Sequence, residues 1–308
     1  MLHVPKVYQY TLYYYDQAGS LISTVPPEGV ELLDEATAHK WDNEIGNRAT
    51  DMPQHRMRTT YAFNSLGQMR KSNTPDGGEK RMLYTSKDQV KLSQDARQYP
   101  TGDWAYVKYD ELGRTVESGL CEGCQNISQA ALDDNSFPDR GSQVLSDITT
   151  TYYDEAYDPT FAADNLRTRV AAATREDDEG DYVTTQVYDY DDHGNVKKTR
   201  TYLVGFGNFE LEYEYDLISG KVNRANYQKG RPDYFAHRYT YDGDNRLIKA
   251  ETTRDNVFWD RDGRYFYYPH GPLARLEIGQ DNVQGNDHYY SIHGWIKGVN
   301  MPEYRSVQ

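Results

Sequence analysis

The stretch DYDDHG, residues 189–194, has the residue types that begin a calcium-binding loop, because Asp189 and Asp191 alternate and a glycine follows. An EF-hand loop needs a bidentate glutamate at its twelfth position, and that position here is Arg200. The match fails, and turn formation explains these carboxylates better than metal binding. Other acidic residues with turn-like spacing are equally weak Ca²⁺ candidates: Asp177, Asp178, Asp181, Asp260 and Asp262.

The two cysteines, Cys121 and Cys124, form the motif CEGC. One CxxC pair supplies half of a tetrahedral metal site, and no second half is present. A redox CxxC usually opens a helix, whereas this pair follows a strand-like run. We expect a pair in a turn-rich loop without a metal or redox role, and its oxidation state stays open.

No catalytic motif stands out from the sequence. His193, His270 and His293 each precede a glycine, so a shared place in a repeat explains them without catalysis. The metalloprotease, P-loop, nucleophile-elbow and dinucleotide-binding motifs are absent. Acidic residues are so abundant that chance carboxylate pairs indicate no glycosidase. The sequence therefore predicts that the protein is not an enzyme, holds no metal and uses no cofactor.

Composition narrows the remaining classes. The 308 residues carry a formal charge of −14, which disfavours nucleic acid as a partner because phosphate binding needs clustered Lys and Arg. No run approaches the roughly 18 apolar residues of a membrane span, and the N-terminus lacks the pattern of a signal peptide. Tyr dominates the apolar residues, with 29 copies against 8 Phe and 4 Trp. Since Tyr is a strong strand former, composition favours an all-β fold.

The turns belong to a repeat, which reads aromatic-x-aromatic-Asp, two residues, Gly, a polar residue and an apolar residue. Its turn positions are Asp16 and Gly19, Asn64 and Gly67, Asp110 and Gly113, Asp191 and Gly194, Asp216 and Gly220, and Asp242 and Asn245. Weaker copies follow Tyr84 and Tyr153, and Pro269 and Ser291 take the Asp place near the end. From Asp191 onward the spacings are 25, 26, 27 and 22 residues, which indicates a tandem array.

Each copy predicts a β-hairpin. Alternating aromatic residues line one face of a strand, Asp bonds to its own backbone, and Gly or Asn supplies the positive φ of the turn. One hairpin is unstable alone, so successive hairpins must pair edge to edge. The tyrosines expected in the resulting wall are Tyr15, Tyr109, Tyr190, Tyr215 and Tyr241.

The segments YYYDQAGSLISTVPPEGV (13–30), YDELGRTVESG (109–119), YYPHGPLARLEIG (268–279) and YYSIHGWIKGVN (289–300) carry a family resemblance. The chain resembles the RHS-repeat or YD-repeat proteins of bacteria, particularly the Bacteroidetes type, along nearly its whole length. The end, about residues 265–300, is similar to part of the RHS-associated core region. The resemblance implies a sheet that spirals into a β-shell, which in toxin complexes and polymorphic toxins encloses a C-terminal effector. The family's self-cleavage motif does not occur before Gln308, so that activity is not carried over.

We expect one domain, residues 1–308, made of antiparallel hairpin repeats that form a spiralling sheet or partial β-shell. Two insertions interrupt the repeats: a helix over about 28–46 and a loop or short helix over about 125–141. Residues 175–181, REDDEGD, read as a charged hairpin tip.

The leading functional hypothesis is a non-catalytic shell segment that encloses or presents another polypeptide. Its partners would be the rest of a larger RHS protein and its effector, and it would be secreted or lie on the bacterial cell surface. The alternative is an extracellular adhesion or carbohydrate-binding module, in which exposed aromatic rings bind glycans; an enzyme is less favoured. Open sheet edges would also allow self-association.

Overall fold

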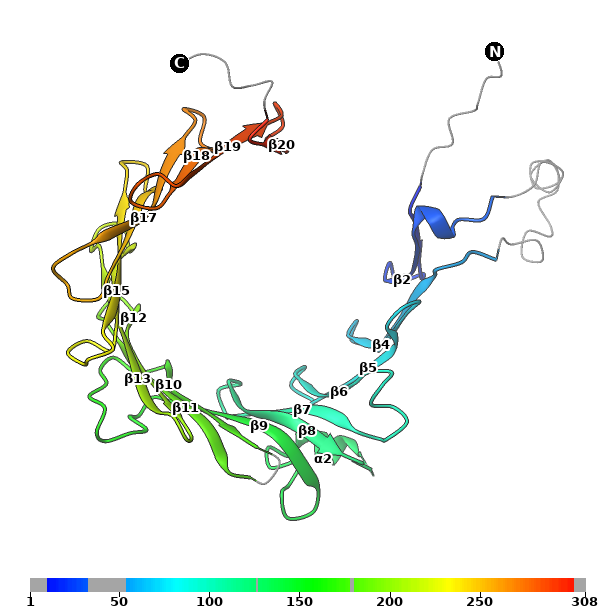
Figure 1. Ribbon diagram of the computed structural model, residues 1–308. Helices are drawn as coiled ribbons and strands as arrows, with labels where there is room; N and C mark the ends of the chain where they lie inside the picture. The colour runs from blue at the N-terminus through cyan, green and yellow to red at the C-terminus, as the bar shows by residue number, and fades with distance from the viewer. Residues whose placement is uncertain (1–9, 33–53, 126, 178–179, 302–308) are drawn as a thin grey trace, which may run out of the picture. The chain divides into compact units, whose positions relative to one another are not determined.

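The computed structural model describes residues 10–32, 54–125, 127–177 and 180–301 (Figure 1). Most of the helix expected over residues 28–46 lies outside these ranges. Within them, that segment contains only the end of a short 3-10 turn, η1 (Pro27–Gly29). One α-helix is described, α2 (Gln129–Asp133), in the segment where a loop or short helix was expected.

Everything else of regular structure in the described residues is strand. The strands are β1 (Leu12–Tyr15), β2 (Leu21–Val25), β3 (Thr59–Phe63), β4 (Met69–Thr74), β5 (Gly78–Tyr84), β6 (Val90–Gln94), β7 (Trp104–Tyr109), β8 (Thr115–Glu122), β9 (Val144–Tyr153), β10 (Val170–Glu176), β11 (Tyr182–Tyr190), β12 (Val196–Leu203), β13 (Gly207–Tyr215), β14 (Val222–Tyr227), β15 (Phe235–Tyr241), β16 (Leu247–Thr253), β17 (Asp260–Tyr267), β18 (Leu273–Ile278), β19 (Gln284–Tyr290) and β20 (Ile296–Val299). The prediction of an all-β fold built from hairpins is confirmed.

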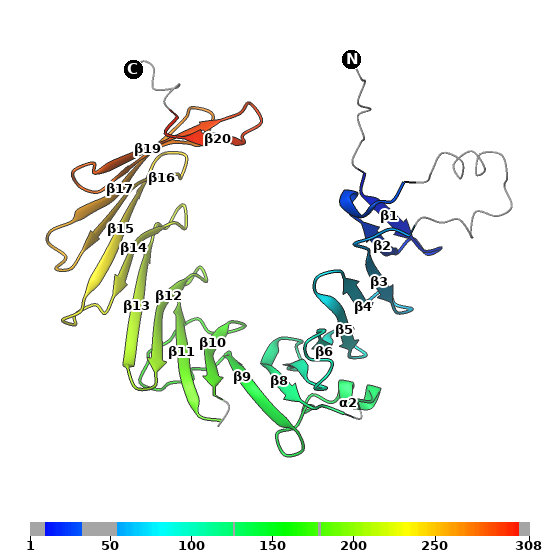
Figure 2. The same cartoon turned by 45° about the vertical axis from the view of Figure 1, so that its right-hand side comes forward.

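The chain divides into two compact units. The first comprises Met1–Thr150 with Glu176–Asp181, and the second comprises Thr151–Arg175 with Tyr182–Gln308, so β9 and β10 contribute to both. In the first unit each strand from β2 to β8 is antiparallel to the strands before and after it in the chain. The same order holds from β11 to β20 in the second unit, as the adjacent strands in Figure 2 show.

The nine repeat hairpins whose strand registers are described share one irregularity. Next to the turn, the pairing shifts by one residue, so that the last residue of the first strand lies opposite the first residue of the second strand. Such a bulge raises the local twist and aims the last side chain of the strand. The bulged pairs are Tyr15 and Leu21, Phe63 and Met69, Tyr84 and Val90, Tyr109 and Thr115, Tyr190 and Val196, Tyr215 and Val222, Tyr241 and Leu247, Tyr267 and Leu273, and Tyr290 and Ile296.

The core of the first unit forms where the insertion around α2 covers the sheet. Leu132 and Phe137 of the insertion pack on Leu92, Trp104 and Tyr106 of the strands. Burial of such side chains contributes roughly 1.5–3 kcal/mol each. The insertion is therefore a cover that a single sheet layer needs.

The cysteine pair belongs to this core, and the expected loop position is right for Cys124 but wrong for Cys121. Cys121 lies in β8 and Cys124 begins the insertion; both are buried, and they form a disulfide. Apolar packing by the insertion, which the local sequence does not reveal, is what buries them.

In the second unit, the loop between β9 and β10 packs on the strands. Phe161 contacts Ala172 and Val187, whereas Leu166 packs near Ala171. Because neighbouring strand residues point to opposite faces, this loop covers part of both faces of β10.

Candidate functional site

The carboxylate and backbone groups that resembled a calcium-binding site are hydrogen-bonded within the repeat turn itself. In the turn at Asp191, the backbone N–H of Asp191 donates to the Asn195 carbonyl over 2.9 Å, and that of Gly194 donates to the Asp191 carbonyl over 3.0 Å. Oδ1 of Asp191 accepts from the backbone N–H groups of His193 (2.9 Å) and Asn195 (2.8 Å). Gly194 has a φ of 92°, which L-residues resist. The carboxylate therefore closes its own turn.

The other predicted turn residues lie in equivalent turns. Oδ1 accepts two backbone N–H groups in each of the turns that begin at Asp16, Asn64, Asp216 and Asp242. The glycine positions have positive φ: Gly19, Gly67, Gly113 and Gly220, with Asn245 in the same role. Asp110 bonds to Arg114, through both the backbone N–H (2.8 Å) and the guanidinium (2.7 Å).

One turn is complete although it has no Asp at the first position and no Gly at the fourth. Thr85 replaces Asp, and its Oγ1 accepts from the backbone N–H groups of Lys87 (3.2 Å) and Gln89 (3.3 Å). Asp88 takes the glycine position with a φ of 64°. The sequence could have predicted this turn. Thr forms the same kind of turn as Asp, although more weakly, and Asp adopts a positive φ more readily than most residues do.

The assignment of Pro269 to the Asp place is wrong. Tyr268 occupies that place instead. Its backbone N–H donates to the Pro272 carbonyl, and the Gly271 N–H donates to the Tyr268 carbonyl. Proline has no N–H and cannot take this role. Ser291 does occupy the equivalent place, donating to the Trp295 carbonyl.

In six of the described hairpins, the tyrosine before the turn bonds to the preceding hairpin. Its hydroxyl donates to the carbonyl of the first residue of that hairpin's second strand, over 2.8–2.9 Å. The described donor and acceptor pairs are Tyr84 and Met69, Tyr109 and Val90, Tyr190 and Val170, Tyr215 and Val196, Tyr241 and Val222, and Tyr267 and Leu247. We call these bonds the tyrosine stitches.

The stitches satisfy carbonyls that the strand ladder does not reach. Pairing between successive hairpins begins two residues beyond the acceptor, for example at Arg224 opposite Arg238, whereas the accepting carbonyl is that of Val222. Burial raises the pKa of Tyr241, as it does for the other stitching tyrosines Tyr109, Tyr190, Tyr215 and Tyr267, so these hydroxyls stay protonated donors. Tyr15, the remaining predicted wall tyrosine, is 60% exposed at the end of β1.

Of the weak calcium candidates, Asp189, Asp260 and Asp262 lie in strands, whereas Asp191 lies in a turn. Asp177 and Asp181 bond to each other across the turn that follows β10, and Asp178 lies outside the described residues. Asp189 is 4% exposed in β11, where Oδ1 accepts the Asp164 N–H of the β9–β10 loop over 2.8 Å. Asp260 and Asp262 lie in β17, and Asp262 accepts from the Thr252 hydroxyl. Within the described ranges, no three His, Cys, Asp or Glu side chains converge as a metal site.

A partly buried charged cluster in the first unit was not predicted from the sequence. Glu117 accepts from the Tyr106 hydroxyl and the Lys108 ammonium, both over 2.8 Å. Arg140 of the insertion reaches Glu176 with two bonds of 2.8 and 3.1 Å, and Glu117 over 3.4 Å. Burial raises the pKa of Tyr106 and keeps its hydroxyl a donor. These groups hold the insertion on the sheet.

A hollow of about 580 Å³ lies beside that insertion in the first unit. Phe63, Met82, Leu83, Trp104 and Ile127 provide its apolar lining. Three cationic side chains line it as well: Arg70, Lys71 and Arg81.

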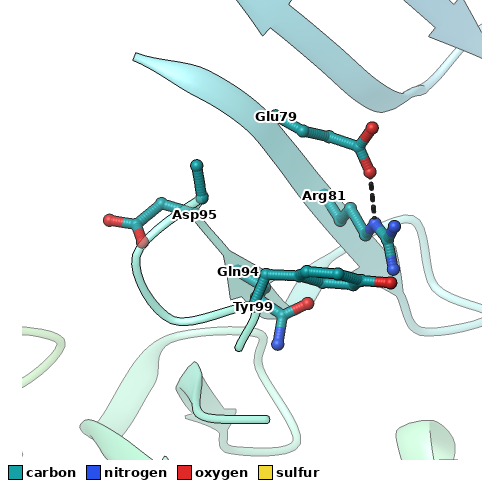
Figure 3. A pocket seen from close by; sticks show the side chains of 6 residues that line it. Glu79, Arg81, Gln94, Asp95 and Tyr99 are labelled. Atoms are coloured by element: carbon teal, nitrogen blue, oxygen red, sulfur yellow. Dashed lines mark hydrogen bonds and ion pairs between the residues drawn. The ribbon is translucent and has the colours of Figure 1, made fainter. Parts of the chain in front are cut away.

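A smaller hollow shares Arg81 with the first (Figure 3). There the Arg81 guanidinium lies 4.2 Å from the centre of the Tyr99 ring, and its Nε is 2.6 Å from Glu79. Hydrogen bonds from Lys71 and Arg81 lower the pKa of Glu79, which therefore stays ionised. Glu79 neutralises part of the cationic lining, while Arg70 is exposed.

No helix among the described residues has the length and apolar character needed to cross a bilayer.

Comparison with known proteins identifies the fold but no family. No family model and no curated protein matches the chain. Among solved structures, a chain of the crystal structure of TcdB2-TccC3-Cdc42 superposes with a TM-score of 0.59 at 15% identity, over 94% of this chain and 12% of that one. A chain of the Photorhabdus luminescens Tc holotoxin pore matches with a TM-score of 0.39 at 14% identity, over 94% and 15%. This chain thus spans only 12% and 15% of the length of these two chains.

Proposed function

We propose that the chain is a non-catalytic segment of an RHS-repeat β-shell, which encloses or presents an associated polypeptide such as a C-terminal toxin effector. The observation that carries this proposal is the hairpin array, in which the repeated Asp carboxylates accept backbone N–H groups of their own turns and the repeated Tyr hydroxyls donate to carbonyls of the preceding hairpin. Groups used in this way build a wall, which supports a structural role.

The fold comparison supports the same reading. The match with the TcdB2-TccC3-Cdc42 chain extends over nearly all of this chain. In the RHS-repeat family that the sequence resembles, the shell encloses an effector. The finer parts of the proposal rest on the sequence: the Bacteroidetes type, a single array over residues 1–308, and a secreted or cell-surface location.

The hollow beside the insertion suits an extended polypeptide. Its apolar lining would accept a large apolar side chain, and the exposed Arg70 would attract a carboxylate. A cationic opening is distinctive in a chain of net charge −14. A shell that holds unfolded cargo needs such contacts, since an unfolded polypeptide exposes apolar side chains that a folded protein buries.

The test uses reduced, carboxymethylated α-lactalbumin, a permanently unfolded acidic protein, as a fluorescent probe. We expect the 308-residue chain to bind this probe and not native α-lactalbumin, and Arg70→Glu to weaken binding several-fold. Arg97→Glu is the matched control, because Arg97 is exposed in the same unit but does not line the hollow. Equal binding of both forms of the probe, or none, would contradict the proposal.

A glycan array decides the alternative. Trp295 is 77% exposed, which is the specific observation in favour of an adhesion or carbohydrate-binding module. Sugar binding that is lost in Trp295→Ala, without binding of the unfolded probe, would replace the shell by that module.

A further inference from the structure

The first and last described strands each have one partner strand. β1 pairs with β2, and β20 pairs with β19. Both strands are unusually exposed: Tyr13 and Tyr15 of β1 are 58% and 60% exposed, and Ile296 of β20 is 63% exposed. Each edge therefore presents backbone donors and acceptors that another strand can use.

Apart from the bulge next to its turn, neither edge carries the features that normally prevent pairing. Residues 11–15, TLYYY, contain no charge and no proline, and residues 295–300, WIKGVN, contain one lysine. Natural edge strands are usually protected by several charges, prolines or bulges that face the solvent. Ile292 and Trp295, beside β20, are 97% and 77% exposed.

Junctions between successive hairpins follow one register. In each described junction, consider the pair of residues that lies closest to the turns. One member lies two positions after the first residue of the second strand of one hairpin, as Arg224 follows Val222. The other lies three positions before the aromatic residue at the bulge of the next hairpin, as Arg238 precedes Tyr241. The described pairs are Ser23 and Thr60, Lys71 and Arg81, Leu92 and Tyr106, Glu117 and Thr150, Lys198 and Glu212, Arg224 and Arg238, Lys249 and Arg264, and Arg275 and Asp287.

The same rule can be applied to the two edges. In β20 the bulged residue is Ile296, so the residue two positions later is Gly298. In the first hairpin the bulged aromatic residue is Tyr15, so the residue three positions before it is Leu12. The register therefore places Gly298 opposite Leu12 and Val299 opposite Thr11.

The tyrosine stitch fits this pairing as well. Tyr15 holds the donor position, and no hydrogen bond of its hydroxyl to another described residue is found. Ile296 holds the acceptor position, equivalent to Val222 or Leu247 in the interior hairpins. One edge has the donor and the other has the matching carbonyl.

We propose that the chain associates head to tail, with β1 of one copy adding antiparallel to β20 of a second copy. Leu12 lies opposite Gly298 of the second copy, and the Tyr15 hydroxyl donates to the Ile296 carbonyl of that copy. The contact joins two different surfaces, so it does not close on itself as a two-fold dimer and allows further copies to add. It does not depend on the proposed shell function.

Cysteine crosslinking tests the register. Opposite residues in an antiparallel pair have Cα atoms about 4.5–5.5 Å apart, within the range of a disulfide. The chain with both Thr11→Cys and Val299→Cys is expected to form covalent dimers and higher oligomers on oxidation. The two native cysteines are already paired, so they do not compete.

Two controls make the outcome decisive. Tyr13→Cys with Val299→Cys puts the cysteines about 7–8 Å apart on the diagonal, so it should crosslink far less. The single variants should give no ladder. Equal crosslinking by the shifted pair, or a crosslinked monomer as the main product, would overturn the proposal.

Sedimentation velocity of the unmodified chain supplies the second measurement. We expect association that rises with concentration, about fivefold weaker in Tyr15→Phe, which removes one hydrogen bond. Thr11→Pro should abolish it, because Pro prevents pairing at the outer edge while the registered β1–β2 pairs begin at Leu12. A circular dichroism spectrum equal to that of the wild type shows that Thr11→Pro is folded. A single monomeric species up to about 100 µM would refute the proposal.

Discussion

Lys91 is a buried cation whose replacement should stabilise the protein. It lies in β6 with 1% of its surface exposed, near Lys108, Glu117 and Asp134. Burial lowers the pKa of Lys91 from its usual value of 10.5 to about 8, and the positive charge of Lys108 adds to the effect. Glu117 is already bonded to Tyr106 and Lys108, so it offsets only part of this penalty.

The pKa sets the magnitude and the pH window. Each unit of difference between the pKa of the folded and of the unfolded state corresponds to about 1.4 kcal/mol. The charge on Lys91 therefore costs about 3 kcal/mol of folding stability. The unfolded chain binds more protons than the folded one between pH 8 and 10.5. The penalty is therefore complete below pH 8, shrinks as the pH rises, and is gone near pH 10.5.

Lys91→Met keeps the length of the side chain and removes the charge. We expect it to raise the free energy of unfolding of the first unit by about 1–3 kcal/mol at pH 7, and by much less at pH 10. Urea unfolding followed by fluorescence checks this, since Trp104 lies in the adjacent core and reports on this unit.

Lys108→Met is the matched control. Lys108 is 2.8 Å from Glu117, so its removal leaves that carboxylate with less compensation and should destabilise the unit by about 1–3 kcal/mol. A destabilised Lys91→Met at pH 7, or a gain that does not change between pH 7 and pH 10, would refute the account of a buried, uncompensated charge.

Three further predictions concern the repeat. Tyr241→Phe removes a tyrosine stitch and should lower the free energy of unfolding in urea by about 1 kcal/mol. Phe63 takes the place of the stitching tyrosine in its hairpin, and the carbonyl that a hydroxyl there would reach is that of Leu21, so Phe63→Tyr should raise the free energy of unfolding by a similar amount. If both changes are neutral, the stitches do not contribute to stability. Gly220→Ala should lower the stability by about 1–2 kcal/mol, because φ is 68° while no atom lies within 4 Å of the added Cβ; an unchanged melting temperature would contradict this. The backbone N–H of Arg246 lowers the pKa of Asp242 below its usual 3.8, so this carboxylate stabilises the fold above that pH and ceases to do so as the pH falls through the lowered value. Asp242→Asn should therefore show a smaller loss of stability in acid melts than the wild type, and an equal loss would rule this carboxylate out as a cause.

The repeat could be predicted because its key interactions are local. The Asp191 carboxylate bonds to N–H groups two and four residues away, and Gly194 supplies a φ that its own residue type permits. The prediction of turn positions was wrong or incomplete where the residue type did not match its role in the turn. Pro269 resembles a turn residue but lacks the N–H that the turn needs, and Thr85 with Asp88 builds the turn from substitutes.

The hollow and the charged cluster could not be predicted in the same way. Glu117 and Arg140 meet because the insertion folds back on the sheet. Lys91 is buried although it lies in a strand. A lysine in a strand-like run gives no sign of whether its face will be covered. The role of Asp189 was misread for the same reason, since its partner lies in a loop 25 residues earlier.

The amino-acid sequence alone determined the hairpin array, the turn positions and the strand-forming tyrosines, because each depends on contacts within about five residues. Only the tertiary structure decided which carbonyl each tyrosine hydroxyl reaches, 15–20 residues away in the preceding hairpin, and which faces the insertions bury. The reason is physical: turn chemistry is set by neighbours in the chain, whereas burial and inter-hairpin bonds depend on how the strands pair and what covers them.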